Sequence, residues 1–447
     1  MDCVKRQAGC GLAEAPPRRS GCWALITAAI LKSMVWVPGL VSAPAMALDV
    51  HGEISGRSEY TDNSRRTSAN KEDDVIHTPQ LDLSVVQKDR LLDIQADYRL
   101  EHRKYVNKTF SDNTLLTGAS RVDAQIAGDT LHWLIRHNRT ETAVNTRLQN
   151  TPDNQQVTNS LSTGPRLRWA ISPRNLVDAL LEYESINENR SGNDSQRVML
   201  DTHITRKLDE ASSFGVRLNA SDVRFQAQGG NDYRRGDFRF TYARELGERS
   251  KFDVELGGVD VNRERGRTER DWSGAFNGSF RFTPGWSADV SMSREATDQA
   301  TQALGGARQF GATNNERSDI SDAFVLSTAR AALIRAGERL NVTWSVQVAR
   351  QNYDQATRDE QRRGTALRFA YRIGPKVTLD AAGSLEVLDF EGQTGHDIQR
   401  DGDVRVSWRP GKNFKADVGV SVSSRDSPRD AVTYRERRAS VGLGYDF

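Results

Sequence analysis

Residues 439–447 read ASVGLGYDF, and this stretch shows the pattern on which the prediction of the fold rests. An apolar set of residues alternates with a small or polar set: Ala439, Val441, Leu443, Tyr445 and Phe447 against Ser440, Gly442, Gly444 and Asp446. Period-two alternation places unlike side chains on the two faces of a β-strand. Terminal residues usually fray and are polar. An apolar terminal strand therefore predicts a paired strand whose outer face meets an apolar environment.

The same alternation recurs along the chain. It is clearest in the segments 92–101, 167–171, 216–220, 340–349 and 414–423. The pattern predicts about twenty strands, each long enough to cross a bilayer when tilted. The least certain pair covers 121–127 and 130–138, and merging or dropping that pair leaves eighteen.

The connections between these strands alternate in length. Short turns built on Pro, Gly and Asn, such as SPRN at 172–175 and IGPK at 373–376, alternate with long polar stretches, such as 61–75 and 145–159. Outer-membrane barrels have tight periplasmic turns and long external loops, whereas a soluble sandwich has no reason to gather every long loop at one end. We therefore predict an all-β fold: a single transmembrane, antiparallel up-and-down β-barrel of about 20 strands, with 18 as the alternative, in the bacterial outer membrane.

The first 47 residues differ from the rest. They contain a basic region, an apolar region and the small-residue pattern Ala45-Met46-Ala47. This organisation predicts a cleaved signal peptide at 1–47 and a barrel at 48–447; an N-terminal membrane anchor is the alternative. Cys3, Cys10 and Cys22 all lie in the presequence, so the predicted mature chain has no disulfide framework.

Charge and hydropathy exclude several classes of protein. The mean hydropathy of −0.65 argues against a helical membrane protein, and no segment after residue 47 has the apolar length of a membrane helix. The presequence holds five Lys/Arg and two Asp/Glu, so the mature chain is close to neutral. A nucleic-acid partner is therefore not expected.

No pattern of catalytic or metal-binding residues stands out. The mature chain lacks G-x-S-x-G, H-E-x-x-H, a phosphate-binding glycine loop and a cysteine ligand pair, and its histidines are scattered. We therefore predict no enzymatic activity, no metal and no cofactor.

The polar faces of the predicted strands carry both signs of charge. The residues predicted to line a pore are Arg99, Arg168, Arg217, Arg239, Arg281, Arg368, Arg372, Arg405, Asp97, Asp201, Asp253 and Asp380. Three interpretations remain open. In the first, the charges form cross-strand ion pairs that hold a lumen open. In the second, the arginines guide a hydrated, anionic or hydroxyl-rich solute through it. In the third, the charged side chains only keep the interior of a structural barrel hydrated.

The end of the last predicted strand has a second implication. Tyr445 and Phe447 resemble the C-terminal signal that the outer-membrane barrel assembly machinery reads. We expect that machinery and outer-membrane lipid as partners of the chain.

The N-terminal half resembles a known group of proteins. The residues concerned are Glu59-Tyr60-Thr61-Asp62-Asn63, a polar acidic loop, TPQLDLSV at 78–85, a strand with Tyr98, and STGPRLRWAISPRNLVDALLEYE at 162–184. They resemble outer-membrane barrels of the "beta-barrel porin 2" kind, associated with exopolysaccharide and PEP-CTERM/exosortase loci. The specific part covers roughly 50–230. The resemblance implies a role near polysaccharide export, with periplasmic polysaccharide-export components as partners, and it carries no active-site residues.

Three functions follow from this reading. The first is an export channel for an exopolysaccharide, the second a general diffusion porin for small solutes, and the third a structural or enzymatic barrel with a blocked lumen. A diffusion porin needs a constriction, for which the best candidate is the segment 295–320, with Gly305, Gly306 and Gly311 to let it bend inward.

Overall fold

The computed structural model describes most of the chain after residue 47. The described ranges are 48–145, 147–190, 194–226, 232–247, 249–265, 268–298, 323–353 and 359–447. Within them lie twenty strands: β1 Asp49–Thr61, β2 Asp74–Lys88, β3 Leu92–Tyr105, β4 Asn113–Ala127, β5 Leu131–Ala143, β6 Gln155–Ser172, β7 Asn175–Glu188, β8 Ser195–Lys207, β9 Ser212–Phe225, β10 Tyr233–Leu246, β11 Ser250–Arg263, β12 Glu269–Thr283, β13 Trp286–Asp298, β14 Ala323–Arg335, β15 Leu340–Tyr353, β16 Glu360–Gly374, β17 Val377–Phe390, β18 Asp397–Trp408, β19 Phe414–Asp426 and β20 Tyr434–Asp446.

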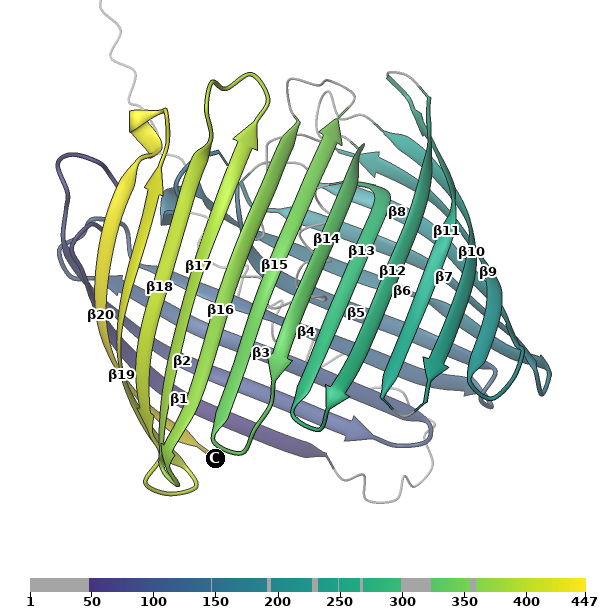
Figure 1. The fold of residues 1–447 in the computed structure, drawn as a ribbon, viewed down its shortest axis with the longest axis horizontal. Coiled ribbons are helices and arrows are strands. Elements are labelled where there is room, and N and C mark those ends of the chain that lie inside the picture. The colour runs from purple at the N-terminus through teal and green to yellow at the C-terminus, as the bar shows by residue number, and fades with distance from the viewer. Residues whose placement is uncertain are drawn as a thin grey trace, which may run out of the picture. The chain divides into compact units, whose positions relative to one another are not determined.

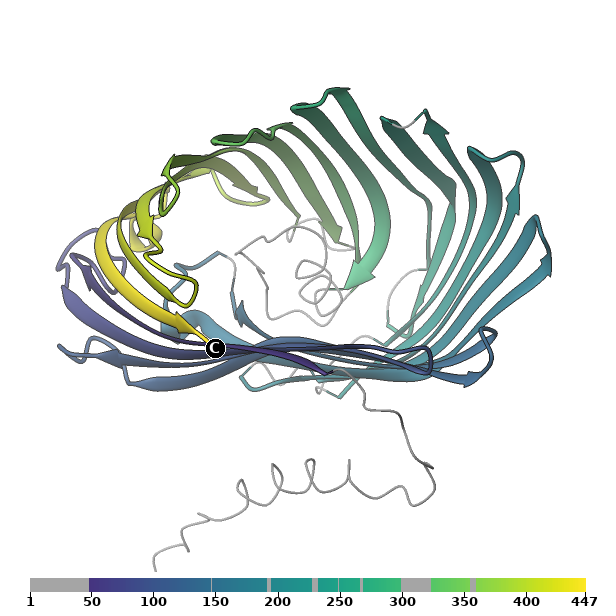
Figure 2. The same cartoon turned by 90° about the horizontal axis from the view of Figure 1, so that it is seen from below.

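The strands form one closed antiparallel barrel (Figures 1 and 2). Each strand pairs with its neighbours in sequence, and β1 pairs with β20 to close the ring, with Ile54 opposite Tyr445 and Ser58 opposite Val441. Closure removes the free edges that an open sheet would expose. The predicted fold class is confirmed. The alternative of eighteen strands is wrong, because the uncertain pair is present as β4 and β5.

Alternation along each strand separates an apolar outer face from a polar inner face. Trp169, Val418 and Leu443 are 55%, 61% and 55% exposed and lie on the outside. Large apolar side chains exposed on nearly every strand would be unfavourable in water, but in a bilayer they face lipid. The neighbours of these residues in sequence, such as Arg168, Asp417 and Gly442, face inward.

The connections confirm the alternation of short and long. Two-residue turns join β6 to β7, β12 to β13 and β16 to β17, whereas residues 62–73 and 144–154 form long connections at the opposite edge. By the rule for outer-membrane barrels, the short turns are periplasmic and the long loops extracellular. In Figure 1 the end of β20 lies at the edge of the short turns. No helix in the described part of the chain is long and apolar enough to cross a membrane.

The last residue of the sequence continues the pairing of β1 with β20. The Phe447 amide donates to the Gly52 carbonyl at 2.8 Å, and the Gly52 amide donates to the Phe447 carbonyl at 3.0 Å. The Phe447 ring lies over Gly52, where an added Cβ would come within 2.4 Å of the ring. Glycine at position 52 therefore leaves the space that the Phe447 ring occupies.

Candidate functional site: the inner wall and the mouth of the barrel

The twelve residues predicted to line a pore all lie at inward positions of their strands. Arg281 stands between the outward Phe280 and Phe282, and Arg372 between the outward Tyr371 and Ile373. Arg217, Asp201 and Arg239 are brought together on adjacent strands, whereas Arg99 and Asp97 lie on a different wall, on β3. That these residues act on a solute stays a prediction.

Several of the predicted arginines form ion pairs across neighbouring strands. Arg99 donates to Asp82 at 2.7 Å, and Arg217 donates to Asp201 at 2.7 Å. Glu255 on β11 accepts from Arg217 at 3.3 Å and from Arg239 at 3.2 Å. Looser pairs join Arg168 to Asp178 at 3.5 Å and Arg405 to Asp417 at 3.6 Å. For these arginines the geometry matches cross-strand pairing rather than free positive charge.

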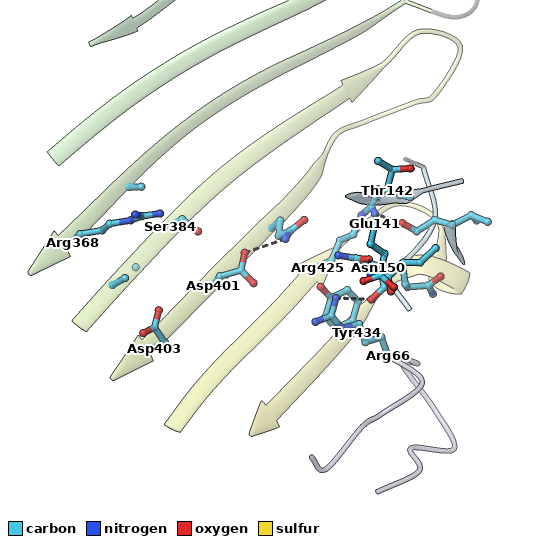
Figure 3. A pocket seen from close by; sticks show the side chains of 18 residues that line it. Arg66, Glu141, Thr142, Asn150, Arg368, Ser384, Asp401, Asp403, Arg425 and Tyr434 are labelled. Atoms are coloured by element: carbon cyan, nitrogen blue, oxygen red, sulfur yellow. Dashed lines mark hydrogen bonds between the residues drawn. The ribbon is translucent and has the colours of Figure 1, made fainter. Parts of the chain in front are cut away.

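Other predicted residues have no ion pair within the described ranges. These are Arg281, Arg368, Arg372 and Asp380, while Asp97 and Asp253 accept hydrogen bonds from Ser84 and Asn277. Arg368 on β16 pairs with Ala382 on β17, and Ala382 pairs with Asp403 on β18. Arg368 and Asp403 therefore lie at the same height, two strands apart. Figure 3 shows Arg368, Asp401 and Asp403 on the same stretch of wall. This part of the wall has charges of both signs that are available to a solute.

The loop 144–154 joins β5 to β6, and its described residues, 144–145 and 147–154, cross the mouth of the barrel to the wall formed by β17–β20. Its far end contacts residues distant in sequence: Gln149 donates to the carbonyl of Ala431, and the Arg147 guanidinium lies 5.0 Å from the Phe390 ring. Asn154 holds the loop together by donating to the carbonyls of Asn145 and Gln149 at 2.8 and 3.0 Å. The loop thereby narrows the extracellular entrance.

Two buried carboxylates hold the arginines that anchor this loop. Glu436 accepts from Arg66 at 2.9 Å, and Arg66 donates onward to the Asn150 carbonyl at 2.9 Å. Asp397 accepts from Arg425 at 2.6 Å, and Arg425 donates to the Leu148 carbonyl at 3.1 Å. Glu436 and Asp397 are both 0% exposed. Each arginine thus joins a fixed carboxylate on the wall to the backbone of the loop.

Figure 3 shows this anchoring site together with the cavity that it borders. Arg66, Asn150, Arg425 and Tyr434 cluster at one end, and Arg368, Ser384 and Asp403 line the wall of β16–β18. The cavity measures about 330 Å³. A larger cavity of about 990 Å³ lies beside it against β1–β3 and β18–β20, and Arg66, Asn150 and Gln155 border both.

The anchoring residues were not among the predicted site residues. The sequence of 145–159 indicates only a long polar connection, and nothing local in it indicates which way the segment folds. Arg66 lies 84 residues from Asn150 and Arg425 lies 277 residues from Leu148. Contacts of this separation leave no local pattern to read.

Most of the predicted constriction segment, 295–320, lies outside the described residues, since the structure describes it only as far as residue 298. The described ends of β13 and β14 do turn into the lumen. Asp298 accepts from Tyr233 on β10 at 2.6 Å and from Arg197 on β8 at 3.3 Å. Arg263 on β11 donates to the Ala323 carbonyl at 2.9 Å. The described ends of β13 and β14 therefore pack against the inner wall formed by β8–β11.

Comparison with known proteins finds similar solved structures but no similar sequence family. No protein-family model matches the sequence, and no curated protein matches it. Among solved structures, the FrpB iron transporter of Neisseria meningitidis is 10% identical, with a TM-score of 0.50 and coverage of 89% of this chain and 83% of that one. The siderophore receptor PirA of Acinetobacter baumannii is 9% identical, with a TM-score of 0.52 and coverage of 91% and 81%.

The protein is an outer-membrane β-barrel. This conclusion rests on the closed twenty-strand ring, the apolar outer face and the likeness in fold to other outer-membrane barrels. Sequence identity near 10% supports a common fold and gives no information about the transported solute. Within the described residues, no cluster of three or more His, Cys, Asp or Glu side chains could hold a metal ion.

Proposed function

We propose that the barrel is a channel that conducts a hydrated, hydroxyl-rich polymer, an exopolysaccharide, across the outer membrane. The observation that carries the proposal is the polar cavity of about 990 Å³ along the inner wall. A twenty-strand barrel is wider than its own side chains can fill.

The pairing of charges on this wall favours sugars over ions of one sign. Arg57 donates to Asp417 at 3.4 Å and Arg438 donates to Glu59 at 2.7 Å, and all four residues line the cavity. A paired guanidinium and carboxylate offer hydrogen-bond donors and acceptors with little net field. A sugar hydroxyl is both a donor and an acceptor of hydrogen bonds. It can therefore exchange one hydrogen-bond partner for the next as the polymer moves along such a wall.

The test is ion conductance of the purified protein in planar bilayers, followed by addition of a polymer. We expect open channels whose current is blocked, in a concentration-dependent way, by an acidic or neutral polysaccharide at lower concentration than by polyethylene glycol of equal hydrodynamic size. Absence of conductance at any voltage would overturn the proposal and leave a barrel with an occluded lumen. Equal block by the two polymers would remove the sugar preference.

A second candidate is a general diffusion porin for small solutes. The observation in its favour is the loop 144–154, which is anchored across the mouth and leaves less room for a polymer. Liposome-swelling rates separate the two. A porin admits monosaccharides and amino acids at rates that follow size alone and excludes longer solutes. The export channel should also admit linear oligosaccharides that are too long for such a porin. Periplasmic export components and the barrel assembly machinery remain proposed partners.

A further inference from the structure

A groove lies on the outer, lipid-facing surface of the barrel over β8–β12. It has a volume of about 650 Å³ and is open to the outside. The outward residues that form it are Leu200, Leu218, Ala220, Gly236, Phe238 and Gly258. It lies in the half of these strands nearer the long loops, since β9 ends at Phe225 and β10 begins at Tyr233.

The groove exists because small residues meet on adjacent strands. Ala220 lies opposite Gly236, and Gly258 lies opposite Phe238. A Cβ added at Gly236 would meet no atom within 4 Å, and one at Gly258 would come no closer than 3.7 Å to another atom. The side chains of Leu218 and Phe238, each 43% exposed, form an apolar border. A slender apolar chain would find contacts here that a flat barrel surface does not offer.

Three exposed arginines stand at the extracellular end of this groove. Arg234 lies on the outward face of β10, two residues before Gly236 in the sequence, and Arg224 lies on the outward face of β9 near the end of that strand. Arg270 on β12 lies opposite Asp260 at the edge of the groove. Their side chains are 77%, 70% and 84% exposed.

These arginines keep most of their donors free. Asp222 accepts from the Nε atoms of Arg224 and Arg234, both at 3.0 Å, and Asp260 accepts from Nε of Arg270 at 2.7 Å. Within the described residues, the terminal guanidinium nitrogens of all three form no hydrogen bond. Asp271 also lines the groove, and Asp232 and Glu264 lie beside Arg224 and Arg234. What this edge offers a ligand is therefore the free N–H donors rather than an excess of positive charge. Free paired guanidinium N–H groups suit phosphate oxygens.

We propose that this surface binds a phosphorylated, multiply acylated lipid of the outer leaflet, with an acyl chain in the groove and a headgroup phosphate on Arg234 and Arg270. The apolar groove and the edge that carries the three arginines are adjacent, at the end of the strands nearer the long loops. A soluble phosphate would contact the arginines but leave the groove empty. An uncharged lipid would fill the groove but leave the arginine N–H donors without an anionic acceptor. The two features together select a lipid that carries both groups.

The experiment uses full-length protein in detergent and purified bisphosphorylated lipid A as probe, with bound lipid counted by native mass spectrometry. Gly236→Leu fills the groove at a position with free space, and the pair Arg234→Gln with Arg270→Gln removes the phosphate donors. We expect each variant to bind lipid A at least tenfold more weakly than the unmodified protein. Inorganic phosphate at the same concentration should not compete.

Matched controls make the result specific. Gly56→Leu adds the same side chain on the outer face of β1, where a Cβ also meets no atom within 4 Å, and Arg350→Gln removes an exposed outward arginine on β15. Both should bind lipid A as the unmodified protein does. Heat-modifiable electrophoretic mobility shows that each variant is folded.

Three outcomes would overturn the proposal. The first is lipid A binding that is unchanged in the groove and arginine variants. The second is equal retention of phosphatidylethanolamine, which would make the surface a nonspecific lipid contact. The third is a dimer mass that Gly236→Leu abolishes, which would assign the groove to a second copy of the chain.

Discussion

At the scale of single residues, burial and pairing decide which charges on the inner wall a solute meets. Arg239 is 9% exposed and bonded to Glu255, Asp237 and Ser273. Its charge is offset within the wall. Arg368 is exposed at its inward position and has no ion pair in the described part of the chain, so its charge is directed into the lumen.

Replacing Arg368 with Gln should shift ion selectivity toward cations, because a free positive charge in a narrow polar lumen raises the local anion concentration. The measurement is the reversal potential of single channels under a salt gradient. Arg350→Gln, an outward exposed arginine on the neighbouring strand β15, should leave the reversal potential unchanged. An equal shift in both variants would mean that Arg368 does not face the conduction path.

A second residue-scale prediction concerns the seam. Gly52→Val should displace the Phe447 ring, because the new Cβ would lie within 2.4 Å of it. We expect a loss of about 1–3 kcal/mol in the free energy of unfolding, the usual cost of overpacking, measured by urea titration of the inserted barrel. Gly56→Val, on the same strand and face with open space around it, should cost much less. Equal losses in the two variants would show that contact with the Phe447 ring is not the cause.

At the scale of elements, the loop 144–154 is held in place by contacts to the opposite wall rather than by its own structure. Arg66 and Arg425 each join a buried carboxylate to a loop carbonyl. Because both carboxylates are completely buried, they keep the arginines oriented, and removing a partner of such a pair costs more than removing an exposed one. A single substitution at either arginine should therefore shift the loop.

Arg66→Gln should weaken the anchoring of the loop while Glu436 retains Thr61 and Arg438 as partners. We expect higher and noisier single-channel conductance, because the loop would spend less time across the mouth. Arg65→Gln is the control: Arg65 pairs with the half-exposed Glu72 at 2.9 Å, an interaction worth little. Unchanged conductance in Arg66→Gln would show that the loop does not limit the current.

At the scale of the whole molecule, the antiparallel pairing of β1 with β20 turns a long meander into a barrel. Every strand then has two neighbours, so no backbone group of a spanning strand must face lipid unpaired. The seam joins residues nearly 400 positions apart, such as Glu53 and Asp446.

Engineered cysteines should report this closure. The chain after residue 22 has no cysteine, so Ser58→Cys with Val441→Cys, which lie opposite each other across the seam, should form an intramolecular disulfide in the folded barrel. Val418 lies one strand further away, opposite Val441, about 10 Å from β1 at the usual strand spacing. Ser58→Cys with Val418→Cys should therefore not cross-link. A comparable yield from both pairs would contradict the register.

The features that can be predicted from the sequence are local. Alternation assigned the faces of the strands, so the inward positions of Arg168 and Arg372 and the outward position of Leu443 followed from period two alone. The alternation of turn and loop lengths gave the strand order and the two edges, and only the doubtful pair around residues 121–138 left the strand number open.

The features that require the folded barrel are non-local. Which loop crosses the mouth, which arginines are neutralised by a partner, and where the outer surface is hollowed depend on groups that closure brings together, such as Gln149 with Ala431, 282 residues apart. A strand's faces are determined by neighbours two residues away, and a periodic sequence records them. A contact between distant segments depends on the register of every strand between them, so no local stretch of sequence contains it.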